Sequence, residues 1–454
     1  MKKNLSEILK KIDKEHYSLL VDIGKISKEE GLKSYLVGGM VRDLLLGFDT
    51  LDIDIVVENN AKLLAKALVK RFSNCELSAK HDRFHTAKII FNINGKKIPI
   101  DLASTREEVY EYPAALPTVS VSDLKRDLYR RDFTINALAI SLLPDAFGEI
   151  VDLFDGLIDL KEKKIRVLHE LSFIDDPTRM IRAVRFACKL GFTIEENTKR
   201  LLKEAINSKQ FDNLIEKIRG DRVKIELRYL FNLLNTEEAV NAFFDSGIYK
   251  MVATDLKPEL SLRGRTKPDE AISLCVTSED CFARLASLAK RVANAPRNDM
   301  KQWLIYLALI IKNLNFEQQE NILKNLQLTS DEIKIIKDGF SVLNKLKERL
   351  KESFDSIIVY RELRNLSIES VLIVKSLLIT HHSSLITLIN EYLEKTSKIK
   401  LEINGQDLIS MGVKEGKMIG EILEKILEIK IKNPAMSKKD EAKEAKTIIE
   451  RLIV

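Results

Sequence analysis

The pattern of apolar residues changes once along this 454-residue chain, and that change constrains the fold more than any other feature. Up to about residue 155, β-branched runs such as SYLVGG and DIDIVV alternate with helical patterns such as NAKLLAKALVKRF. Beyond that point apolar residues recur at helical spacing, as in MKQWLIYLALIIKNL and IGEILEKILEIKI. The sequence therefore predicts an α+β fold, an α/β head followed by an all-helical arm.

Composition is that of an ordinary globular protein, with 45% apolar and 31% charged residues. No apolar run reaches membrane-spanning length, and the N-terminal segment MKKNLSEILKKIDKEHY has the pattern of a charged amphipathic helix rather than a signal peptide. The four cysteines are scattered, which argues against a zinc site or a disulfide framework. We expect a cytoplasmic protein with no membrane partner.

The segment YLVGGMVRDLLLG predicts a strand, a Gly-Gly turn and a helix in succession. Gly38 and Gly39 allow the backbone to approach a ligand closely, and the N-terminus of the following helix favours anions. Arg42 adds a positive charge nearby. This corner is a candidate triphosphate-binding site, although a plain tight turn has the same sequence pattern.

Two aspartates follow in LDIDIVV, a predicted strand. Asp52 and Asp54 lie two residues apart, so both carboxylates project from one face. Magnesium prefers a few carboxylates together with phosphate oxygens, and two such ions can activate a hydroxyl and stabilise leaving pyrophosphate. Asp52 and Asp54 are therefore candidate metal ligands and catalytic residues, with Asp101 of KIPIDLAST as a possible third carboxylate; a solvated strand end is the alternative.

The segment RRDFTIN offers groups suited to a sugar and its phosphates. Arg131 can donate to phosphate oxygens, Asp132 can accept from a ribose hydroxyl, and Asn136 can bridge the two kinds of group. As an isolated string, the same residues would form a surface cluster of ion pairs.

Base selection is predicted in DDPTRMIRAVRF, where Asp176 and Arg179 lie three residues apart on an expected helix and share a face. A carboxylate accepts from an exocyclic amine, and a guanidinium donates to an unprotonated ring nitrogen or a carbonyl. Cytosine and adenine present that combination, whereas guanine and uracil present the reverse. The pair could select C and A without a template; alternatively, Asp176 caps a helix that begins at Pro177.

The order of these motifs, continued by DRVKIELRYLF, resembles that of class II tRNA nucleotidyltransferases and bacterial poly(A) polymerases, members of the DNA polymerase beta superfamily. The resemblance implies a polymerase-beta-like head, Mg²⁺ as cofactor, and CTP, ATP and the acceptor end of tRNA as partners. It adds Arg182 and Arg185 as candidate nucleotide-binding residues. RFHTAKIIF resembles the RFGTA-type pattern of the tRNA enzymes, with His85 at the usual glycine, which argues against a poly(A) polymerase.

We expect four parts: the catalytic head at 1–155, a neck for base selection and RNA binding at 156–235, a body at 236–395 and a tRNA-binding tail at 396–454. In the tail, the turn and helix of SMGVKEGKMIGEILEKIL make Lys414 and Lys417 candidate ligands of an RNA phosphate, although solvated lysines fit the pattern equally well. The segment STREEVYEYPAALPTVSVSD lacks periodicity and is predicted to be a loop beside the active site.

The sequence thus predicts an enzyme that adds C, A or both to the 3′ end of tRNA. A CC-only or A-only enzyme, a poly(A) polymerase and a non-catalytic RNA-binding protein are the alternatives. The formal net charge of +6 suits a polyanionic partner only if the basic residues gather on one face. The oligomeric state stays open.

Overall fold

The structure is a computed structural model that describes residues 5–10, 12–48, 52–81, 85–112, 114–208, 218, 220–233, 236–253, 301–349, 355–378, 383–414 and 416–453. The chain divides into two compact units, Met1–Thr254 and Asp255–Val454. The finer division into head, neck, body and tail stays a prediction. Within the described ranges, no helix combines the length and the apolar character needed to cross a membrane.

A seven-stranded mixed sheet with the strand order β3-β4-β5-β2-β1-β8-β9 forms the head. The strands are β1 (Ser34–Val37), β2 (Ile53–Val57), β3 (Cys75–His81), β4 (Thr86–Ile93), β5 (Lys96–Ser104), β8 (Leu138–Ser141) and β9 (Ile150–Asp152). β2 and β5 run parallel, and their register places Asp54 opposite Asp101. The predicted α/β head is confirmed.

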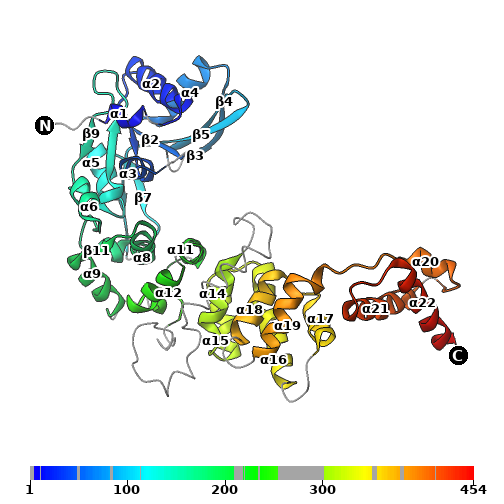
Figure 1. Cartoon of the computed structure of the whole chain (residues 1–454). Coiled ribbons are helices and arrows are strands. Elements are labelled where there is room, and N and C mark those ends of the chain that lie inside the picture. The colour runs from blue at the N-terminus through cyan, green and yellow to red at the C-terminus, as the bar shows by residue number, and fades with distance from the viewer. Residues whose placement is uncertain are drawn as a thin grey trace. The chain divides into compact units, whose positions relative to one another are not determined.

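Helices α1 (Ser6–Leu9), α2 (Lys14–Glu29), α3 (Gly39–Leu46) and α4 (Ala61–Arg71) accompany the sheet. Buried residues recur on α4 at Ala61, Leu64, Ala65 and Leu68, the spacing of one helical face. That face packs on β3, β4 and β5, with α2 beside it (Figure 1). The side chain of Asn60 caps α4 by accepting from the N–H of Leu63 at 3.1 Å.

The segment predicted to be a loop contains a β-hairpin instead. Strands β6 (Arg106–Val109) and β7 (Thr118–Val121) pair antiparallel, with Arg106 opposite Val121. Neither strand buries one face fully, so no alternation of apolar and polar residues marks them in the sequence. The loop prediction was wrong for these residues because the backbone ladder, and not a buried face, defines the hairpin.

His85 occupies the position at which the resembling pattern has glycine. His85 has a φ of +51°, within the left-handed region. Glycine enters that region without strain, whereas a side chain with a Cβ is disfavoured there.

The rest of the first unit is mainly helical. Its elements are α5 (Leu124–Tyr129), η1 (Thr134–Asn136), α6 (Gly156–Glu162), β10 (Lys164–Ile165), α7 (Ser172–Asp175), α8 (Thr178–Leu190), β11 (Thr193–Ile194), α9 (Glu196–Ile206), α11 (Gly220–Phe231), α12 (Thr236–Asp245) and η2 (Ile248–Met251). α8 ends at Gly191, whose φ of +65° stops the helix in the left-handed conformation. Both α11 and α12 pack against α8, which carries the predicted base-selecting segment towards the head.

Every regular element described from residue 301 onward in the second unit is helical. The elements are α14 (Gln302–Ile311), α15 (Phe316–Asn325), α16 (Ser330–Glu348), α17 (Ser356–Leu363), α18 (Ile368–Leu378), α19 (Ser383–Glu394), η4 (Thr396–Lys398), α20 (Gly405–Ser410), α21 (Lys417–Lys432) and α22 (Lys438–Ile453). The last three helices share a core that includes Ile403, Leu408, Ile422 and Ile449. The predicted helical arm is confirmed for these residues.

Candidate active site

A cavity of about 510 Å³ gathers most of the predicted site residues in the first unit. Its lining includes Gly38, Gly39, Arg42, Asp52, Asp54, Arg131, Asp132, Asn136, Asp176, Arg179, Arg182 and Arg185. These residues come from the β2 region, from the turn and helix of α3, from the segment 131–136 that ends in η1, and from the region of α8. They are up to 147 positions apart in the sequence, from Gly38 to Arg185. Asp101 lies outside this lining.

Asp54 stands on β2 and Asp52 lies two residues before it, both exposed and alternating with buried Ile53 and Ile55. Asp101, opposite Asp54 on β5, accepts from Lys88 Nζ at 3.1 Å and lines a second cavity of about 470 Å³ that Asp54 also lines. Although Asp54 is exposed to the cavity, the protein around its carboxylate partly desolvates it, and this together with the charge of Asp101 raises the pKa of Asp54. Bringing these carboxylates together costs energy that a bound cation would relieve.

The Gly-Gly turn lies directly beside these acids. Gly38 has a φ of +74°, and a Cβ added there would lie 3.2 Å from Arg131 Nη1 and 3.7 Å from Asp54 Oδ2. A side chain at this position would therefore be strained and would press on the cavity wall. Gly39 begins α3, so the N–H groups of the first helical turn lie at the cavity.

Arg42 is buried and already bonded within the protein. Its Nε donates to Asp43 Oδ1 at 2.7 Å and its Nη1 donates to Asn136 Oδ1 at 2.7 Å. Its guanidinium also lies 4.9 Å from the ring centroid of Phe186. Arg42 lines the cavity as predicted, and its contacts fix Asn136.

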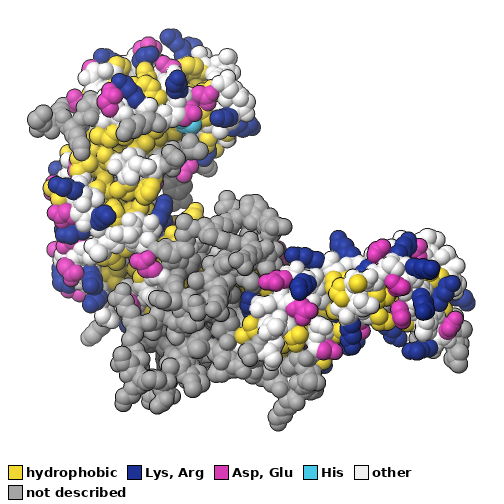
Figure 2. All heavy atoms as spheres, in the orientation of Figure 1, with side chains coloured by type: hydrophobic (Ala, Val, Ile, Leu, Met, Phe, Trp, Pro, Cys, Tyr) yellow, Lys and Arg dark blue, Asp and Glu magenta, His cyan; other side chains and the backbone are white. Residues whose placement is uncertain are grey.

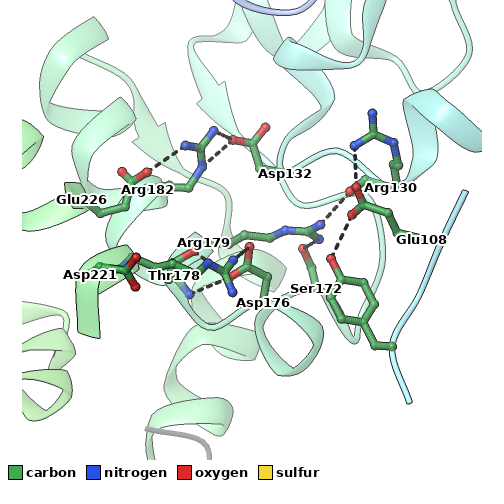
Figure 3. Close-up of polar contacts among 12 residues, drawn as sticks. Glu108, Arg130, Asp132, Ser172, Asp176, Thr178, Arg179, Arg182, Asp221 and Glu226 are labelled. Atoms are coloured by element: carbon green, nitrogen blue, oxygen red, sulfur yellow. Dashed lines mark hydrogen bonds and ion pairs between the residues drawn. The ribbon is translucent and has the colours of Figure 1, made fainter. Parts of the chain in front are cut away.

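Asp132 is a buried acid held by the side chains of Asn136 and Arg182, and Figure 3 shows its contact with Arg182. Asn136 Nδ2 donates to its Oδ1 at 2.9 Å, and Arg182 Nε donates to its Oδ2 at 2.9 Å. Burial opposes ionisation, but Arg182 and Asn136 outweigh it and lower the pKa of Asp132. Asp132 is therefore a carboxylate at neutral pH, as an acceptor for a ribose hydroxyl must be.

Glu226 on α11 was not predicted as a site residue, yet it fixes two that were. Arg182 Nη1 and Arg185 Nε each donate to one of its oxygens at 2.9 Å. The positions of both guanidiniums at the cavity therefore depend on a helix far along the chain.

Asp127 was also missed. It is fully buried and accepts from Arg130 Nη2 at 2.8 Å and from Arg131 Nη2 at 2.9 Å. Burial opposes its charge, but the two arginines lower its pKa. Its spacing of three and four residues before these arginines on a helical pattern was the signal that could have revealed it. The Nε of Arg131 is buried and has no hydrogen-bond partner among the described residues.

The predicted base-selecting residues lie at the same cavity, with one correction. Asp176 is not helical, because its backbone is extended between α7 and α8 (φ −135°, ψ 91°). Its Oδ1 accepts from the N–H and the hydroxyl of Thr178 at 3.1 and 2.6 Å. The helix begins at Thr178 with Pro177 at the N-cap position, one residue later than the helix-capping alternative predicted. Arg179, in the first turn of α8, donates to Ser172 Oγ at 2.8 Å and to the carbonyl of Arg130 at 2.6 Å.

Lys414 and Lys417 belong to the second unit, apart from the residues that line the cavity. Both are exposed, and Lys417 begins α21 after Gly416, whose φ is +132°.

Figure 2 shows lysine and arginine side chains interspersed with aspartate and glutamate on the face that it draws, with no purely basic surface there.

The mixed sheet, the Gly-Gly turn before a helix and the paired aspartates on the neighbouring strand define a polymerase-beta-like nucleotidyltransferase fold. Comparison with known families agrees, since residues 34–166 match the poly A polymerase head domain and residues 278–442 match tRNA nucleotidyltransferase domain 2.

Three similar proteins extend over nearly the whole chain. The A-adding tRNA nucleotidyltransferase of Geobacter sulfurreducens is 34% identical over 93% of this chain and 46% of its own length. The CCA-adding enzyme of Latilactobacillus sakei is 30% identical over 88% of this chain and 90% of its own. The solved structure of the Thermotoga maritima CCA-adding enzyme complexed with tRNA_CCA is 31% identical, covers 98% of this chain and 99% of its own, and has a TM-score of 0.75.

The chain belongs to the family of tRNA nucleotidyltransferases that includes these CCA-adding enzymes. It spans only about half the length of the A-adding relative.

Proposed function

We propose that this protein transfers nucleotides from CTP and ATP to the 3′ end of tRNA without a nucleic-acid template. The observation that carries the proposal is the shared cavity, which has carboxylates, a Gly-Gly turn and a base-selecting pair on its walls. The carboxylates suit the metal ions of a phosphoryl-transfer reaction, and the pair suits the Watson–Crick edges of cytosine and adenine.

The acids fit magnesium as the cofactor, with Asp52 and Asp54 as ligands and Asp101 as a third carboxylate next to Asp54. Within the described ranges, no group of three or more His, Cys, Asp or Glu side chains is placed to hold a metal ion alone. Phosphate oxygens of the nucleotide would complete the coordination, as is usual for magnesium. Bound magnesium would supply charge neutralisation at the reacting phosphate and activation of the 3′ hydroxyl.

The protein's own residues would bind and orient the substrates. The N–H groups after Gly38 and the Arg131 guanidinium at the cavity wall suit the triphosphate, and the ionised Asp132 suits the ribose. Asp176 accepts from the exocyclic amine, while Arg179 donates to the ring nitrogen. Catalysis by this arrangement is positioning and electrostatics, with no covalent enzyme intermediate. Lys414 and Lys417 would hold a phosphate of the tRNA backbone. The expected location of the protein is the cytoplasm.

Addition of A alone is a second candidate, because the Geobacter relative, 34% identical, is named an A-adding enzyme. The two candidates differ in the tRNA that they extend. An enzyme for the whole CCA end extends a tRNA that lacks all three nucleotides, whereas an A-adding enzyme extends only a tRNA that already ends in CC.

The test supplies purified protein and magnesium with three tRNAs, which end before the first C, after both Cs, or in the mature CCA. Products formed with CTP, ATP or both are sized on a gel. Full CCA on the shortest tRNA identifies the complete reaction, and extension of only the CC-ended tRNA identifies the A-adding reaction. A stop after two Cs would show a CC-adding enzyme, and long A tails a poly(A) polymerase. No extension of any tRNA, with no release of pyrophosphate, would refute the proposal in favour of an RNA-binding protein.

A further inference from the structure

The carboxylate of Asp176 is held by a residue outside the cavity lining, Arg222 on α11. Arg222 Nη2 donates to Asp176 Oδ2 at 2.7 Å, while the other oxygen accepts from Thr178. The side chain of Arg222 is 29% exposed and that of Asp176 is 15% exposed, so solvent screens the ion pair only in part. Three hydrogen bonds therefore orient this carboxylate, which has about four acceptor positions.

Arg179 is held from a different direction. Its guanidinium donates to Ser172 and to the carbonyl of Arg130, and Figure 3 shows it reaching towards these groups, away from α11. Asp176 and Arg179 thus have separate sets of partners, although they carry opposite charges and lie only three residues apart. Such neighbours attract one another, and an ion pair between them would occupy the groups that must face a base.

We propose that Arg222 is a positioning residue for base selection, which keeps the Asp176 carboxylate turned towards the nucleotide and prevents it from pairing with Arg179. The inference rests on the proposed function of Asp176 and extends it to a residue that contacts no substrate. The remaining acceptor position of Asp176 is then available to the exocyclic amine of cytosine or adenine. Uracil and guanine present a carbonyl at that place, which an oriented carboxylate repels.

The same helix offers an internal contrast. Glu226 lies four residues after Arg222 and bonds Arg182 and Arg185, which are not the base-selecting residues. Loss of Glu226 should weaken the binding of every nucleotide alike. Loss of Arg222 should change the ratio between nucleotides, because Arg222, unlike Glu226, bonds the base-selecting Asp176.

The experiment compares Arg222→Gln and Arg222→Lys with the full-length wild-type chain. It measures kcat/KM for single additions of the nucleotide that wild type adds, CTP or ATP, and of its mismatched counterpart, UTP or GTP. We expect Arg222→Gln to lower the ratio of correct to mismatched addition about tenfold, which corresponds to about 1.4 kcal/mol. Arg222→Lys keeps the charge without the planar fork and should lower the ratio by a smaller factor. Arg228→Gln, at an exposed position of α11, is the matched control and should keep the wild-type ratio.

A merely structural role would reduce the correct and the mismatched additions in proportion and leave the ratio unchanged, as we expect for Glu226→Gln. An unchanged ratio in Arg222→Gln would overturn the inference. If that variant does not fold, Arg222→Lys decides in the same way, because an unchanged ratio there also overturns it. A wild type without preference for CTP or ATP would instead refute the proposed function.

Discussion

Asp54 lies where two cavities of the first unit adjoin, since it lines both, as Arg130 and Arg131 also do. It faces Asp101 across the strand pair β2–β5 and lies close to the Gly38 turn. No other predicted metal ligand has this position between the nucleotide side and the second cavity. At the scale of single residues, the reaction should therefore be most sensitive to Asp54.

Asp54→Asn should reduce magnesium-dependent pyrophosphate release by about a thousandfold, because the amide keeps the shape but loses the charge that binds the metal. Pyrophosphate release with CTP or ATP and a suitable tRNA measures the effect, and circular dichroism checks the fold. Asp145→Asn changes an acid whose side chain is 66% exposed and should behave like wild type. Activity within a few fold of wild type in Asp54→Asn would contradict the assignment.

His169 provides a pH-dependent contribution to stability. Burial and the charge of Arg179 lower its pKa from 6.5 to about 4. The unfolded chain then binds more protons than the folded chain between these values, so stability is full above pH 6.5 and decreases as the pH falls towards 4. A shift of this size corresponds to at most about 3.4 kcal/mol.

His169→Gln should therefore flatten the pH dependence of the free energy of unfolding between pH 7 and pH 4. Urea denaturation at several pH values in this window measures the slope. A variant whose slope equals that of wild type would show that His169 is not the group responsible.

At the scale of elements, close approach of helices to the sheet decides where glycine is needed. Gly24 is a buried residue in the middle of α2, and an ideal Cβ there would lie 1.7 Å from the carbonyl oxygen of Leu142. Gly420 lies in α21, is exposed, and has nothing within 4 Å of such a Cβ. Both glycines are helical, so the two positions differ mainly in their surroundings.

Gly24→Ala should destabilise the first unit by about 2–3 kcal/mol, because the backbone carbonyl cannot move aside as a flexible side chain could. Gly420→Ala should leave stability unchanged or raise it by up to about 1 kcal/mol, since alanine favours a helix over glycine. Urea or thermal unfolding of both variants beside wild type is the measurement. Equal effects of the two substitutions would contradict the packing of α2 on the sheet.

At the scale of the whole molecule, the nucleotide cavity lies in one unit and the proposed phosphate ligands Lys414 and Lys417 lie in the other. Nucleotide binding and tRNA binding should therefore be separable by mutation. Backbone phosphate contacts carry a salt dependence that base recognition lacks, which gives the two functions different experimental signatures.

Lys414→Ala with Lys417→Ala should weaken tRNA binding and reduce the slope of log K against log salt by about 1–2, while leaving KM for CTP and ATP close to wild type. Filter binding or fluorescence anisotropy over a range of salt concentrations measures the slope. Lys345→Ala with Lys347→Ala removes two exposed lysines of α16 and serves as the control. A slope unchanged by the first pair would exclude these lysines as phosphate ligands.

Patterns within short segments were enough to predict the α/β head, the helical arm and the motifs that line the cavity. Local periodicity failed for β6 and β7, because strands without a fully buried face have no alternating pattern. It also placed Asp176 on a helix, whereas the residue precedes α8 in an extended conformation. The assigned chemical roles of the cavity residues stay predictions until the variants are measured.

The sequence by itself determined which residues are available for chemistry and on which kind of element most of them lie, since spacing along a strand or helix settles which side chains share a face. Only the tertiary structure decided what holds those residues in place. Asp132 and Arg182 are 50 positions apart, Arg182 and Glu226 are 44 apart, and Arg222 and Asp176 are 46 apart. The packing of α11 on α8 and of α8 on the head creates these ion pairs, and no local pattern specifies partners at such separations.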